Sequence, residues 1–180
     1  VRIVAAGGQA NIAKLKLDLP KRMVPRLSTL QHACTVSVFD AGPAGCPAAS
    51  VVGSATILTQ ILRMPLQGRV YVLSRGHAAS PEIALALQGE GVAVEVVGQT
   101  QLAHGVESVA FRALPDVPFS QLDVLLEAGP HSLLASSSAD GLCGRRLWMP
   151  TELTAQNGAV IKQTVDVTVS GCTRARKLHA

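Results

Sequence analysis

Three histidines lie beside a glycine or a proline in the sequence: His77, His104 and His131. A histidine activates a serine hydroxyl when a carboxylate orients its ring, so a hydrolase would need one of them close to both groups. The candidate carboxylates are Asp116, Asp123 and Asp140. Positions beside glycine and proline are typical of exposed loops, however, and surface histidines are the simpler interpretation. An extracellular hydrolase is therefore our third hypothesis for function.

Two pairs of carboxylates offer a different chemistry, the cleavage of a glycosidic bond: Glu90 with Glu95, and Asp116 with Asp123. Nothing in the sequence fixes the separation within either pair, and aromatic residues make up only 3% of the chain. The sequence also lacks the nucleophile elbow, the P-loop, the zinc-protease motif and the EF-hand loop. We therefore predict a protein that is not an enzyme and has no catalytic residues, no metal and no cofactor.

Gly89-Glu90-Gly91 begins like a dinucleotide-binding motif, but Val94 stands where the third glycine belongs. Because the flanking residues alternate as strands do, this segment is typical of a hairpin turn.

Trp148 is the single tryptophan, and it follows Arg145 and Arg146. A lone tryptophan in a strand usually packs in the core, with its indole N–H donating to a carbonyl. If the ring were exposed beside the two arginines, it would instead mark a contact with a partner or a glycan. These three residues are the contact patch that we predict.

The four cysteines allow three pairings. Asn157-Gly158 between two alternating segments predicts a two-residue hairpin, and in an unbroken ladder this places Cys143 opposite Cys172. The register has a flaw, because it puts Pro150 at a hydrogen-bonded position and separates the apolar residues of the two strands onto different faces. A bulge near Pro150 would correct this and would leave the two cysteines offset by one residue.

Elimination then pairs Cys34 with Cys46 across a short loop. Free buried thiols and a metal site are the alternatives, but zinc ligands usually come in close pairs, and only His32 and Cys34 are so spaced. Two disulfides would place the protein in an oxidising compartment.

Period-two alternation of apolar and polar residues dominates the chain and predicts nine strands. The predicted strands are 12–19, 51–62, 69–74, 82–88, 92–102, 107–114, 121–127, 146–155 and 160–169. The spacing of Ser28 and Gln31 predicts one short helix near 28–34. We expect an all-β fold, an antiparallel β-sandwich of jelly-roll or immunoglobulin type. It forms one domain over residues 1–172, and a basic tail follows at 173–180. Lys14 and Lys16 suggest that the first predicted strand is a sheet edge open to strand addition.

Charge and hydropathy exclude other classes. The net charge of +4 is divided into +5 over residues 1–30, +3 over the last ten and −4 between them, which is not the continuous basic face of a nucleic-acid binder. Residues 41–62 carry no charge, but their prolines and glycines exclude a membrane-spanning helix. Because the chain begins at Val1 without Met, we expect it to be a processed fragment.

Five segments together resemble a recurrent β-rich module of large secreted or surface-anchored actinobacterial proteins. They are LKLDLPKRMVPRLSTLQHAC, CPAASVVGSATI, LQGEGVAVEVVG, LPDVPFSQLDVLLEAGPHSLLA and QNGAVIKQTVDVTVSGC. The most specific marks are Cys34, Cys46 to Ser50 with Gly53, Pro115 to Phe119, Gly129-Pro130, and Cys143 with Cys172. The resemblance implies an extracellular location and carries no established activity.

The sequence as a whole predicts a secreted or cell-surface module with a structural or interaction role and no catalysis. Its expected partners are neighbouring modules or cell-envelope polymers, with no nucleic acid, no membrane insertion and no small-molecule cofactor. The alternative hypothesis is a module that binds a glycan or a cell-wall polymer, with Trp148 and its arginines as the contact.

Overall fold

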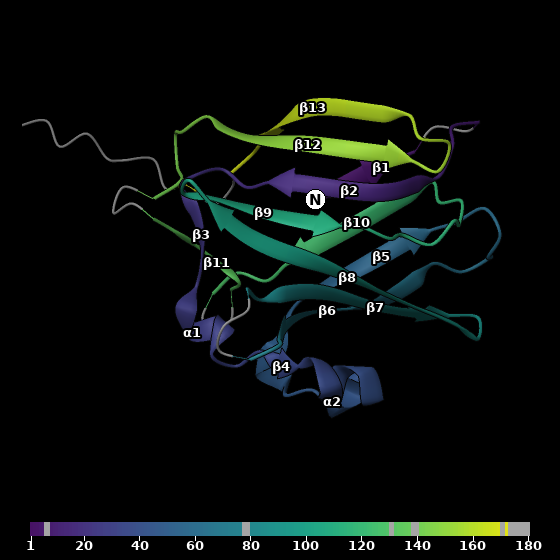
Figure 1. The fold of residues 1–180 in the computed structure, drawn as a ribbon, viewed down its shortest axis with the longest axis horizontal. Helices are drawn as coiled ribbons and strands as arrows, with labels where there is room; N and C mark the ends of the chain where they lie inside the picture. The colour runs from purple at the N-terminus through teal and green to yellow at the C-terminus, as the bar shows by residue number, and fades with distance from the viewer. Residues whose placement is uncertain (6–7, 77–79, 130–131, 138–140, 170–171, 173–180) are drawn as a thin grey trace, which may run out of the picture.

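Most of the chain forms one curled, mainly antiparallel sheet (Figure 1). The computed structural model describes residues 1–5, 8–76, 80–129, 132–137, 141–169 and 172. The strands of the sheet lie in the order β1 (Arg2–Val4), β10 (Gln121–Leu126), β5 (Val51–Leu58), β6 (Leu66–Ser74), β7 (Glu82–Gly89), β8 (Val92–Ala103), β9 (Val106–Phe111), β2 (Ile12–Asp18), β12 (Leu147–Ala155) and β13 (Val160–Val167).

Short elements complete the fold. Strand β4 (Cys34–Thr35) pairs in parallel with the end of β6, and β3 (Met23–Pro25) pairs with β11 (Leu134–Ser136) as a separate ribbon. The helical segments are α1 (Leu27–Leu30), α2 (Val36–Ala41) and the 3₁₀ turns η1 (Pro43–Gly45) and η2 (Ala48–Ser50). Among the described residues, none of these helices has the length and apolarity needed to cross a bilayer.

The all-β, antiparallel class is confirmed, and each of the nine predicted strands is present. The sandwich is not confirmed, because the long strands join in one continuous sheet that curls on itself. Alternation of apolar and polar residues indicates that one face of a strand is buried. Two packed sheets and one curled sheet both produce this pattern, so the pattern does not distinguish them. The predicted tail at 173–180 lies outside the described residues.

The inner face of the curled sheet holds the main core. Alternate residues of six neighbouring strands point into it, from β10 through β5, β6, β7 and β8 to β9. Val52, Val70 and Val72 at its centre have no exposed surface. The inward positions of these strands are therefore mainly apolar, as the alternation in the sequence requires.

A second, smaller core covers the opposite face of β6 and β7. Cys34, Phe39, Tyr71, Leu73 and Ala84 form it, and the Phe39 ring meets Tyr71 edge-on with centroids 5.5 Å apart. The Cys34–Cys46 disulfide closes the segment that lies over this face, with Cα atoms 5.3 Å apart. This pairing is confirmed.

The predicted helix is only partly correct. Helix α1 is a single turn at Leu27–Leu30 with Arg26 as its N-cap, so Ser28 lies inside the turn and does not cap it. Cys34 belongs to β4, and the neighbouring helix α2 was missed. A six-residue helix shows too few turns for its period to be visible in the sequence.

The second predicted disulfide is also confirmed, in the offset arrangement. Cys143 and Cys172 are bonded with Cα atoms 5.7 Å apart. The predicted two-residue turn is wrong, because Leu147 pairs with Val167 and Ala155 with Ala159, which leaves a three-residue turn. The extra residue lies at Gly158, whose φ of 84° suits glycine, and not in a bulge near Pro150.

Strand β2 is not a sheet edge, which corrects the prediction of a strand open to addition. It pairs with β12 on one side and with β9 on the other. Along β12 the pairing with β2 begins at Thr151, the residue that follows Pro150. The missing proline N–H therefore interrupts no hydrogen bond between β12 and β2. Lysines at alternate positions are equally compatible with an edge strand and with a central strand that has one solvated face.

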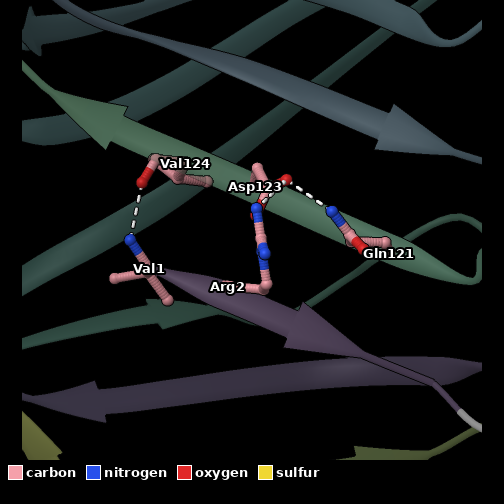
Figure 2. Close-up of polar contacts among 5 residues, drawn as sticks. All are labelled: Val1, Arg2, Gln121, Asp123 and Val124. Carbon is pink, nitrogen blue, oxygen red and sulfur yellow. Dashed lines mark hydrogen bonds and ion pairs between the residues drawn. The ribbon is translucent and has the colours of Figure 1, made fainter.

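The edge strands are instead β1 and β13. Figure 2 shows how β1 is held on β10. Arg2 donates to both carboxylate oxygens of Asp123, at 2.6 and 3.2 Å, and Gln121 donates to the same carboxylate. The hydrogen bonds from Arg2 and Gln121 lower the pKa of Asp123 below its ordinary value.

A carboxyl group lies on the inner face of the sheet. Glu107 shares that face with Val109 and Phe111 and is only 7% exposed. Burial raises the pKa of Glu107 above its ordinary value of 4.5. The folded protein therefore holds this proton more tightly than the unfolded chain does. The resulting stabilisation is complete below pH 4.5 and is lost as the pH rises through the raised pKa.

We predict that Glu107→Gln stabilises the protein at pH 7, because the ionised and buried carboxylate is then replaced by a neutral amide. The gain in free energy of unfolding relative to the wild type should disappear below about pH 4, where Glu107 is protonated. Urea denaturation at a series of pH values measures this difference. Glu95→Gln, at an exposed position of β8, is the control and should show no such pH dependence. A Glu107→Gln variant that is less stable than the wild type at pH 7 would contradict the prediction.

Candidate functional site: a polar groove on the outer sheet face

Strands β7, β8, β9, β2, β12 and β13 are successive neighbours in the sheet (Figure 1). Their outer face carries one continuous row of paired residues. The registers of five neighbouring strand pairs align Glu82, Gln99, Ala110, Lys16, Glu152 and Lys162 side by side. Five strand spacings of 4.8 Å give this row a length of about 24 Å. Five of the six side chains are polar or charged, and Ala110 leaves room in the middle.

Two hollows lie along this row. The larger, of about 540 Å³, extends from Glu82 and Gln99 across Ala110 to Lys16 and Glu152. The smaller, of about 400 Å³, lies between Lys16, Glu152 and Lys162 and reaches Pro150 and Thr164. Because Lys16 and Glu152 line both, we treat the two hollows as one site and name it the polar groove.

Some charges in the polar groove neutralise one another. Lys16 lies 3.0 Å from Asp18, which also accepts a hydrogen bond from Ser108. Burial acts to raise the pKa of Asp18, but the hydrogen bonds from Ser108 and Lys16 and the charge of Lys16 outweigh it and leave the pKa below its ordinary value. Lys162 lies 3.0 Å from Glu152. These pairs hold their side chains across the floor of the groove.

Two cations of the larger hollow are not neutralised in this way. Lys14 and Arg112 both line it, and neither side chain has an ion-pair or hydrogen-bond partner in the part of the chain that the structure describes. The pairing of β2 with β9 ends at Leu15 and Phe111, and Lys14 of β2 and Arg112, the residue after β9, lie just past that end. The hollow therefore contains a local excess of positive charge.

Glu82 forms the opposite wall of the larger hollow. Its side chain is 6% exposed, and Oε1 accepts a hydrogen bond from Arg75 at 2.9 Å. The other oxygen, Oε2, is buried and has no hydrogen-bond partner among the described residues. A buried carboxylate oxygen without a donor is costly, so a hydroxyl or N–H group of a ligand would be favoured here.

Trp148 lies beyond the smaller hollow on the same outer face. Its strand neighbours Leu147 and Met149 are buried, whereas the indole is 55% exposed, so the ring points outward with Pro150 and Glu152. The cross-strand partner of Trp148 is Asp166. The exposed alternative that the sequence left open for Trp148 is therefore the one that the structure has.

The other predicted site residues do not gather at the groove. Arg145 and Arg146 are exposed just before β12 and line neither hollow. His104 occupies the β8–β9 turn with a φ of 52° and is exposed. His77 and His131 lie outside the described residues, as does Asp140.

Three of the four carboxylates of the glycosidase hypothesis are engaged in local structure, whereas Glu95 is exposed on β8. Asp116 accepts a hydrogen bond from Asn11, Asp123 binds Arg2, and Glu90 accepts from the Met64 amide. Glu90 and Gly91 form the predicted turn between β7 and β8, with φ values of 48° and 78°. Within the described residues, no group of three or more histidine, cysteine or acidic side chains could hold a metal ion.

Sequence reasoning missed most of the groove residues. Gln99 and Glu152 are ordinary outward-facing residues of their strands, Arg112 follows β9, and no motif distinguishes them. The outward positions of these strands carry polar and charged residues that could have predicted the groove. They can be recognised as one row only when the spatial order β7-β8-β9-β2-β12-β13 is known.

Comparison with protein-family models, with curated proteins and with solved structures finds no match to this chain. The resemblance to a secreted actinobacterial module therefore stays a prediction, and the functional argument depends on the groove itself.

Proposed function

We propose that this chain is a non-catalytic, secreted or cell-surface interaction module that binds a glycan or a related cell-envelope polymer along the polar groove. The observation that carries the proposal is the exposed Trp148 on the same outer face as a row of polar side chains about 24 Å long, four residues along β12 from Glu152 of that row. An exposed indole stacks on the apolar face of a sugar ring, and a row of polar groups along one direction suits a chain of hydroxyl-bearing units.

The two disulfides support the location outside the cytosol, because such bonds persist in oxidising compartments. Polar groups along the groove support the ligand class. Within the described part of the chain Glu82 Oε2 has no donor, and the exposed side chains of Gln99 and Gln101 line the same hollow. A polyhydroxylated ligand can donate to the carboxylate and also accept from the amides.

Trp148→Ala should lower the affinity for such a polymer by at least 10-fold, because the stacking surface is removed. Affinity electrophoresis in gels that contain a neutral glucan, a uronic acid polymer or a poly(glycerol phosphate) measures this. Trp148→Phe, which keeps a ring, should retain most of the affinity. Leu125→Ala is the matched control, since Leu125 is 68% exposed on β10, away from the groove.

Retardation of the wild type by at least one polymer, lost in Trp148→Ala alone, would support the proposal. The polymer recovered from the complex should keep its chain length, because the module does not cleave it. If none of the three polymers retards the wild type, or if Trp148→Ala binds as well as the wild type, the proposal is wrong.

A further inference from the structure

Two cations of the polar groove that have no side-chain partner among the described residues point to the charge of its ligand. Lys14 and Arg112 line one hollow, just past the point where the pairing of β2 with β9 ends at Leu15 and Phe111. Like charges that line one hollow repel each other, and the nearby carboxylates are engaged elsewhere. Glu82 is bonded to Arg75, Glu152 lies by Lys162 and Asp18 lies by Lys16.

We propose that Lys14 and Arg112 bind an anionic group of the ligand, so that the groove takes an acidic, hydroxyl-bearing polymer. This inference rests on the proposed function and specifies its ligand. An oxyanion between the ammonium and the guanidinium would remove their repulsion and form charge-assisted hydrogen bonds. Gln99 lines the same hollow, and Thr154 pairs with Lys14, so an amide and a hydroxyl are available as further donors.

Glu82 gives the same ligand a second requirement. Glu82 lies in the same row as Ala110 of β9, about 10 Å away over two strand spacings, and Arg112 is two residues further along the chain. A buried carboxylate repels an anion but accepts from a hydroxyl. The polymer therefore presents its acidic group at Lys14 and Arg112 and neutral hydroxyls at Glu82.

A carboxylate of a uronic acid and a phosphodiester of a polyol phosphate share the oxyanion that this site recognises. Nucleic acid also carries phosphate, but the residues between the two ends of the chain have a net negative charge. In β7, β8, β9, β2, β12 and β13 as the structure describes them, the only aromatic residues are Trp148 and Phe111, and Phe111 packs against the main core. We therefore expect a single-stranded oligonucleotide to bind more weakly than the acidic glycan polymers.

The test compares Kd values at low salt for a neutral glucan, a uronic acid oligomer, a glycerol phosphate oligomer and a single-stranded DNA oligomer. The wild type should bind one of the two acidic oligomers at least 10-fold more tightly than the neutral one, and the better of the two identifies the oxyanion. The double variant Lys14→Gln with Arg112→Gln should lose this preference and keep the affinity for the neutral glucan. The charge-conserving variant Lys14→Arg with Arg112→Lys should keep the preference.

A matched control removes one lysine and one arginine elsewhere. Lys21 and Arg69 are exposed and line neither hollow, so Lys21→Gln with Arg69→Gln changes the net charge equally and should leave the preference intact. If the Lys21→Gln, Arg69→Gln variant loses the preference for the acidic oligomer as fully as the Lys14→Gln, Arg112→Gln variant does, net charge and not this site explains the preference. The inference is then overturned.

Three further outcomes are informative. Equal binding of neutral and acidic oligomers that still depends on Trp148 would overturn the anionic ligand and leave the proposed function standing. Tighter binding of the DNA oligomer than of any glycan oligomer would overturn the inference in favour of a nucleic-acid surface. Absence of binding to all four oligomers would contradict the inference and the proposed function together.

Discussion

Replacing Cys34 and Cys46 with alanine should lower the free energy of unfolding by about 3 kcal/mol through chain entropy alone, given the separation of 12 residues that the disulfide closes. A further loss arises because Cys34 is 1% exposed and packs with Phe39 and Tyr71 in the smaller core. Urea denaturation under non-reducing conditions measures the total. The near-UV circular dichroism of Tyr71 should also change, since the segment that carries Phe39 is no longer tied to the sheet.

The other disulfide is the control. Cys143 and Cys172 are exposed, so their replacement by alanine should cost about 3.5 kcal/mol from the longer loop and leave the Tyr71 signal unchanged. A loss below 1 kcal/mol for the Cys34 and Cys46 variant would show that the disulfide does not hold this segment on β6 and β7.

Gly68→Ala should destabilise the protein by about 3 kcal/mol, at the upper end of the range for overpacking. A Cβ atom at Gly68 would lie 1.7 Å from the Ala86 carbonyl oxygen, which belongs to the backbone of the neighbouring strand β7. The clash cannot be relieved by a rotamer change, so β6 and β7 would have to separate at the centre of the sheet. Both cores depend on these two strands.

Gly45→Ala is the matched control for this prediction. Its Cβ would meet only Val38 Cγ1, at 3.4 Å, and the expected change is within about 0.5 kcal/mol. Thermal unfolding followed by far-UV circular dichroism compares the two variants. Equal Tm values for Gly68→Ala and the wild type would contradict the close approach of β6 and β7.

The sequence predicted the strands well because each long strand has one buried face. In β2, Leu15 and Leu17 alternate with Lys14 and Lys16, and the structure buries Leu15 and exposes both lysines. The sequence did not predict the shortest strands. Strands β1 and β3 span three residues each, which is too short to show the alternation of apolar and polar residues.

What the sequence could not supply was the spatial order of the strands. Alternation places Lys14 on the solvated face, but it does not say that Arg112, just after another strand, lines the same hollow or that Glu82 stands across it. Trp148 illustrates the same limit, because a lone tryptophan in a strand usually packs in a core, and only the burial of its neighbours Leu147 and Met149 shows that this one faces outward. Local pattern determined the strands, and long-range pairing created the candidate site.

The most direct test of the polar groove is a titration of ¹⁵N-labelled protein with the tightest-binding acidic oligomer, followed by amide chemical shifts. We predict that the largest changes lie at Lys14, Gln99, Arg112 and Glu152 and extend to Trp148, while residues 34–50, which pack over β6 and β7 and line neither hollow, keep their shifts. Changes centred on residues 34–50, with the groove amides unaltered, would contradict the account.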